Sequence, residues 1–137
     1  MTFPMVRKYT ARVQPVSTVG NDLRTIVGVA SESETVTLVQ YVPTSTQAGA
    51  NSNSRTLNLF NRNATDGTGT VLVASLALVT GVDLIDNVAK TLPLSGTPSN
   101  LALTAGCVME FSSDHVGTGL ADPGGLVIVT TVRTVIP

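Results

Sequence analysis

Apolar residues along this chain alternate with polar ones or gather in short runs of β-branched residues, and helical spacing is rare. In residues 35–42, for example, alternation places Val36, Leu38 and Val42 on one face of an extended chain and Val39 on the other. Alternation with a period of two is the pattern of a β-strand. The pattern predicts strands over residues 25–30, 35–42, 55–61, 71–78, 88–92, 101–103, 107–112 and 126–135.

The segment around Asp66-Gly67 has the composition of a tight turn, because both residues tolerate a positive φ angle. One predicted strand ends near Asn61 and the next begins near Val71. We therefore predict a β-hairpin that turns at Asp66-Gly67. By contrast, the glycine-rich stretch from residue 113 to residue 125 is predicted to be a long loop.

The last predicted strand, residues 126–135, is the most apolar of the series. Continuous apolarity favours a central strand that is covered on both faces, or a strand with one face covered by a neighbouring subunit. The chain also has a surplus of apolar residues with few charges to keep a monomer in solution. We therefore predict an oligomer whose interface uses residues 126–135 or the loops beside them.

About eight short strands separated by turn signals predict an all-β fold, namely an antiparallel β-sandwich or a jelly-roll-like barrel. The first twenty residues fit this pattern less well, because Phe3-Pro4 and Gln14-Pro15 interrupt any strand pairing there. The predicted organisation is an extended N-terminal arm over residues 1–20 and a β-sandwich domain over residues 21–137.

The composition also favours association with other protein molecules. Only 12% of the 137 residues are charged, against about 25% in an average soluble domain. The polar surface must then consist largely of Thr, Ser, Asn and Gly, which repel neighbouring molecules weakly. A net charge of −1 argues against sequence-independent nucleic-acid binding. No apolar run approaches the roughly 20 residues of a membrane span, and no signal-peptide layout opens the chain, so synthesis in the cytoplasm is expected.

The residue types of known active sites are scattered. The single histidine, His115, follows Ser112, Ser113 and Asp114, but adjacent residues of one loop seldom form a triad. The single cysteine, Cys107, lies in an apolar run and is predicted to be a buried core residue. Neither these residues nor the scattered carboxylates, Asp122 among them, have the spacing of a metal site. We therefore expect no enzyme activity, cofactor or metal.

Two regions of the sequence carry a resemblance to a known family. One comprises residues 37–43, residues 55–61 and the turn at residues 66–69; the other is residues 115–127. Together they resemble the capsid decoration, or cement, proteins of tailed double-stranded DNA bacteriophages, over roughly residues 35–135. The resemblance implies a β-sandwich or jelly-roll fold and a homo-oligomer, often a trimer. It also implies the major capsid protein as partner and the virion surface as location. It assigns no catalytic residues.

The basic residues near the N-terminus suggest where such a capsid contact would lie. Three of the eight Lys and Arg residues fall within the first twelve positions, while the rest of the chain is net acidic. Apolar residues beside them would otherwise be left in water. We therefore predict a capsid contact through the N-terminal arm, formed by Phe3, Met5, Arg7, Lys8 and Arg12.

Two other functions are weighed against this one. A receptor- or carbohydrate-binding module of a phage tail or fibre is the main alternative. Such modules present aromatic platforms, and this chain has only five aromatic residues and no tryptophan. A small β-rich hydrolase is the third interpretation, and it rests only on residues 112–115. Exposed aromatic residues around a groove would favour the alternative; a flat apolar patch beside basic residues would favour capsid binding.

Overall fold

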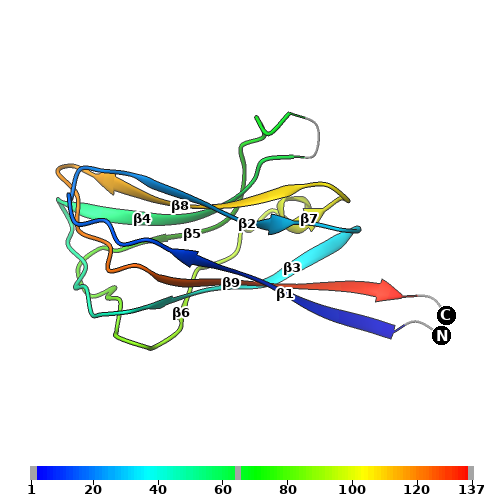
Figure 1. Ribbon diagram of the computed structural model, residues 1–137, viewed down its shortest axis with the longest axis horizontal. Coiled ribbons are helices and arrows are strands. Elements are labelled where there is room, and N and C mark those ends of the chain that lie inside the picture. Colours follow the sequence, from blue (N-terminus) through cyan, green and yellow to red (C-terminus); the bar gives the residue numbers. More distant parts are fainter. Residues whose placement is uncertain (1–2, 64–65, 136–137) are drawn as a thin grey trace.

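The structure is a computed structural model that describes residues 3–63 and 66–135. Within them, two antiparallel β-sheets pack face to face as a sandwich (Figure 1). The elements are β1 (Phe3–Val13), β2 (Leu23–Val29), β3 (Glu34–Pro43), β4 (Ser54–Asn61), β5 (Val71–Ala77), β6 (Lys90–Thr91), the short 3-10 helix η1 (Pro98–Leu101), β7 (Ala102–Leu103), β8 (Val108–Val116) and β9 (Gly125–Val135).

The order of the strands is that of a jelly roll. The larger sheet has the order β1-β9-β3-β6, with β7 also paired to β3, and the smaller sheet has the order β2-β8-β4-β5. The strands form four antiparallel pairs, in which early strands pair with late ones. The pairs β1·β9 and β3·β6 belong to the larger sheet, and β2·β8 and β4·β5 belong to the smaller sheet. This is the arrangement of eight-stranded jelly rolls. The fold class predicted from the sequence is confirmed.

Each predicted strand has a counterpart in the structure, with three differences. β8 continues to Val116, so the first residues of the predicted loop at 113–125 belong to a strand. The strand predicted over residues 88–92 is reduced to β6. A β-bulge between Val36 and Leu38 shifts the alternation of β3, so that Val36 is buried on the same side as Val39. Bulges insert one unpaired residue, which simple alternation does not reveal.

Much of the predicted arm is an edge strand. Residues 3–13 form β1, which pairs along its whole length with β9, from Phe3 opposite Val135 to Val13 opposite Gly125. Pro4 is tolerated there because edge strands leave some backbone groups unpaired. The ring of Tyr9 packs over β2 at Gly28, where a Cβ atom would lie 2.8 Å from the ring. The segment therefore belongs to the sandwich as far as Val13.

The predicted hairpin is present in the smaller sheet. β4 and β5 are antiparallel neighbours, with Asn61 opposite Val71. The connection between them runs from residue 62 to residue 70, so it is wider than a two-residue turn, and it stands away from the sheets (Figure 1). Within it, Gly67 has a φ of 71°, and Asp66 Oδ1 accepts a hydrogen bond from the backbone N–H of Thr68. Residues 64 and 65 lie outside the described residues.

The hydrophobic core lies between the sheets. Its centre contains Tyr41 of β3 and Phe111 of β8, whose rings stack across the two layers with centroids 5.3 Å apart. Leu57 and Leu59 of β4 are fully buried beside them. Cys107 is buried in the same cluster, as predicted from its apolar neighbours.

Candidate functional site

The outward face of the larger sheet carries apolar side chains that the sandwich does not cover. Along β9, Val127 and Val129 are buried in the core, so Leu126, Ile128 and Val132 project to the opposite side. Strand register places outward residues of β1 and β3 beside them. We call this surface the outer face, which consists of Val6, Lys8, Thr10, Arg12, Leu38, Gln40, Val42, Leu126, Ile128, Thr130 and Val132.

Six of the eleven residues of the outer face are apolar. Val6 is 64% exposed and Leu126 is 39% exposed, and the other apolar members are half-buried. At the centre, Thr130 is almost fully buried, yet its hydroxyl has no hydrogen-bond partner among the described residues. The exposed face of an antiparallel sheet is ordinarily polar. Uncovered apolar side chains on such a face mark an interaction surface.

The charge of the outer face has a single sign. Lys8 lies opposite Thr130, and Arg12 lies opposite Leu126. Both are exposed, and neither forms an ion pair within the described part of the chain. No carboxylate belongs to the outer face. A partner that covers it must therefore supply negative charge together with apolar groups.

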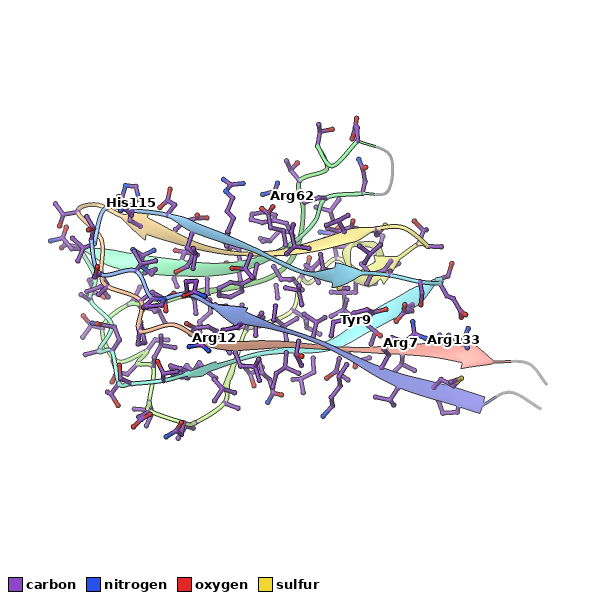
Figure 2. The ribbon with its side chains drawn as sticks, in the orientation of Figure 1. Arg7, Tyr9, Arg12, Arg62, His115 and Arg133 are labelled. Carbon is purple, nitrogen blue, oxygen red and sulfur yellow. The ribbon has the colours of Figure 1, made fainter. Side chains whose placement is uncertain are left out.

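The structure divides the five residues predicted to contact a capsid. Lys8 and Arg12 lie on the outer face, whereas Arg7 points to the other side of β1 and contacts Ser31 and the carboxylate of Glu34. Figure 2 shows Arg7 beside Tyr9 and Arg12 farther along the same strand. Met5 is 46% exposed, and the side chain of Phe3 lies outside the described residues.

Glu34, which the sequence analysis did not single out, fixes β1 to its sheet. This buried carboxylate accepts hydrogen bonds from Thr131 Oγ1 at 2.5 Å and from the Tyr9 hydroxyl at 2.8 Å. The hydrogen bond to Tyr9, together with the negative charge of Glu34, raises the pKa of Arg7. Arg7 therefore stays charged and is occupied within the chain. No local pattern reveals this, because Thr131 is distant in sequence and the alternation of β1 is mixed.

A second buried polar cluster closes one end of the sandwich. Asp122 Oδ1 accepts hydrogen bonds from the Tyr41 hydroxyl at 2.6 Å and from the backbone N–H of Gly124, and its Oδ2 accepts one from Ser113 Oγ at 2.6 Å. Burial, then the Asp122 charge, raises the pKa of Tyr41 well above its ordinary value. Tyr41 therefore remains a donor. Both oxygens of Asp122 are used for structure.

Arg55 completes this cluster. It is fully buried at the start of β4, and its guanidinium donates to the carbonyl oxygens of Leu120, Ser113, Val19 and Asn21 at 2.7–3.0 Å. The side chain thus joins the loop before β2, strand β8 and the loop before β9. A buried arginine is tolerated when its donors are satisfied in this way.

The residues that suggested a hydrolase are directed to separate partners. Ser113 donates to Asp122 on the inner side of β8, while Ser112 donates to Asp114 on the outer side at 2.9 Å. His115 instead contacts a third carboxylate, with its Nδ1 atom 2.6 Å from Asp22 Oδ1. A triad needs a serine hydroxyl bonded to the histidine, whereas Ser112 and Ser113 donate to carboxylates. Residues 3–63 and 66–135 also contain no group of three His, Cys, Asp or Glu side chains placed to hold a metal.

The contact between His115 and Asp22 predicts a local response to acid. The backbone N–H of His115 donates to Asp22 Oδ1 at 2.8 Å, and this bond, followed by the side-chain contact, lowers the pKa of Asp22. The stabilisation is therefore present at neutral pH and is lost as the pH falls through the lowered pKa. We expect the segment before β2 to loosen in that range, as measured by hydrogen exchange. In an Asp22→Asn variant this pH dependence should disappear; if it persists, another group is responsible.

Comparisons with known proteins give only distant structural matches. No protein-family model and no curated protein matches the chain. Among solved structures, the chain is similar to the structure of infectious bursal disease virus Gx strain, with 12% identity and a TM-score of 0.42 over 93% of this chain. It is also similar to the infectious bursal disease virus VP2 subviral particle, with 10% identity and a TM-score of 0.39 over 96%. The chain spans about a third of the length of each matched structure: 32% in both cases. In the described residues, no helix is long and apolar enough to cross a membrane.

Proposed function

We propose that this protein is a structural virion protein that binds the outside of a phage capsid and decorates or stabilises the head. The observation that carries the proposal is the outer face, an apolar sheet surface with Lys8 and Arg12 and without a carboxylate. The sequence resemblance to capsid decoration proteins supplies the partner, the major capsid protein. The proposed role is one of binding alone and requires no reaction or cofactor.

The physical basis of the contact is burial of the outer face. Covering a Leu, Val or Ile side chain completely contributes roughly 1.5–3 kcal/mol relative to full exposure, and half-buried residues contribute proportionally less. Val6 and Leu126 therefore have the most to gain among the apolar members. Lys8 is near the middle of β1, and it would give the contact its orientation and its sensitivity to salt. If copies on one shell are also linked to one another, their individually weak contacts would together hold the coat stably on the capsid.

Charge reversal at Lys8 tests the capsid contact. We expect Lys8→Glu to weaken binding to expanded capsids about tenfold or more, because it places a carboxylate in the outer face against an acidic partner surface. Binding is measured by co-sedimentation of the purified protein with capsids that lack it, over a range of salt concentrations. Lys90→Glu is the matched control, because Lys90 also has no ion pair among the described residues but lies on β6.

Three results of this experiment are distinct. Loss of binding in Lys8→Glu with retention in Lys90→Glu supports the outer face as the contact. Equal binding by both variants and the unchanged protein contradicts the assignment of the face. Absence of capsid binding by the unchanged protein contradicts the proposed function. In that case, binding to host cells or glycans would favour a receptor- or carbohydrate-binding module.

A further inference from the structure

The edge of the larger sheet opposite β1 carries a charge of the other sign. Residues 84–88 connect β5 to β6 and lie beyond the end of β3, where the backbone N–H of Asn87 donates to Pro43 O at 3.0 Å. Leu84 anchors the segment by pairing with Gln47 and is fully buried. The segment therefore has a fixed position at the sheet edge.

The exposed side chains of this segment combine apolar groups with a free carboxylate. Ile85 is 47% exposed and Val88 is 53% exposed. Between them, Asp86 is exposed, and its carboxylate has no ion pair or hydrogen bond within residues 3–63 and 66–135. The nearest cation along the chain, Lys90, is half-buried on β6 opposite Tyr41. Ile85 and Val88 therefore flank an unpaired carboxylate. Such a surface is complementary to an apolar surface that carries an unpaired basic side chain.

An unpaired base lies at the other edge of the same sheet: Arg12 of β1, beside Leu126 of β9. Arg12, Leu126 and Val42 form one row across β1, β9 and β3, and residues 84–88 lie at the end of β3 just past this row. Arg12 also borders a hollow of about 150 Å³, whose other walls include Pro15 and Thr44. The hollow gives a carboxylate room to approach the guanidinium.

Arg12 and Asp86 of one chain do not meet. Strands β1 and β6 are separated by β9 and β3, which corresponds to roughly 14 Å across the sheet at the usual strand spacing. Both groups are nevertheless at the same end of the larger sheet, one at each edge. Arg12 and Val42 lie on either side of Leu126, and Asn87 is hydrogen-bonded to Pro43, the residue after Val42. A second copy placed alongside, in the plane of the sheet, would bring its Asp86 to the Arg12 of the first.

We propose that copies of this chain associate side by side, with the Arg12 edge of one copy bound to the 84–88 segment of the next. The contact joins two different surfaces, so it is head to tail, and such contacts close into a ring only with at least three copies. Ile85 and Val88 pack near Leu126, and Asp86 pairs with Arg12. The middle of the outer face stays free, so the ring is compatible with a capsid contact but does not depend on one.

A charge-swap experiment tests the ring with the purified full-length protein. The unchanged protein is expected to be a ring, with the trimer as the smallest form, when its mass is measured by light scattering and native mass spectrometry. Arg12→Asp alone and Asp86→Arg alone are each expected to give monomers, because each places like charges in contact. The double variant, Arg12→Asp with Asp86→Arg, is expected to restore the ring.

Two matched controls change charges outside the proposed contact. The first control is Lys8→Asp, because Lys8 is on the same strand and face as Arg12 but about 13 Å away along β1. The second is Asp66→Arg, which changes an exposed acid in the β4–β5 connection. Both should keep the ring, and circular dichroism should show all variants folded. A monomeric unchanged protein overturns the proposal. So do single variants that remain rings, and so does a double variant that remains monomeric.

Discussion

Replacing Arg55 with alanine is expected to lower the free energy of unfolding by about 3–5 kcal/mol, because it leaves several buried carbonyl oxygens without donors. The guanidinium is fully buried and donates to Leu120, Ser113, Val19 and Asn21. Removing it also opens a cavity between the loop before β2, strand β8 and the loop before β9. Urea unfolding, followed by circular dichroism, measures the loss.

Arg24→Ala is the matched control for Arg55→Ala. Arg24 lies on β2 with its side chain 60% exposed, and its contact with Glu110 at 3.5 Å is at the surface. Exposed ion pairs contribute little, so this variant should unfold with nearly the stability of the unchanged protein. If Arg55→Ala were equally mild, the cluster around Asp122 would not be what holds this end of the sandwich closed.

Gly119→Ala is expected to be at least as damaging, and for an independent reason. Gly119 has a φ of 87°, and a Cβ atom there would lie 1.9 Å from the carbonyl oxygen of Val19. The left-handed conformation costs a non-glycine residue of order 1–3 kcal/mol, and relieving the overlap must separate two loops that Arg55 joins. We expect the urea concentration at the unfolding midpoint to fall sharply, or the variant not to fold.

Gly20→Ala provides the comparison for Gly119→Ala. Gly20 is on the facing loop, and the nearest atom to an added Cβ, Thr118 O, is 4.0 Å away. The substitution should therefore change the unfolding midpoint little. A similar effect of both substitutions would show that the close approach of the two loops is not required for folding.

Alternation of side chains was sufficient to predict most of the sandwich, because strands such as β2 and β3 alternate more buried residues with more exposed ones. It failed for β1. The first strand pairs with the last, as in Phe3 opposite Val135, and an edge strand with Pro4 and several charges does not show a clean apolar stripe. The basic residues near the N-terminus were therefore interpreted as an arm, although residues 3–13 belong to the sheet.

The candidate site was only partly predictable for a related reason. The sequence indicated Arg7, Lys8 and Arg12 as basic residues near the N-terminus, and separately indicated the apolar strand at residues 126–135. In the structure, only Lys8 and Arg12 lie on the same side of the sheet as the outward residues of that strand. Only the register of β1 on β9 shows that these form one surface. The partners of Arg55 depend equally on tertiary structure, because its acceptors come from loops far apart in the chain. The acidic segment at residues 84–88 gained significance only from its place at the opposite edge.

The proposed capsid contact is tested most directly by imaging expanded capsids incubated with the purified protein by electron cryomicroscopy. The account predicts density on the outside of the shell, with the larger sheet toward the capsid and Val6 and Lys8 in the contact. Shells that remain bare after incubation with the protein would contradict the proposed function. Bound copies that face the shell with the smaller sheet or the loop ends would contradict the assignment of the outer face.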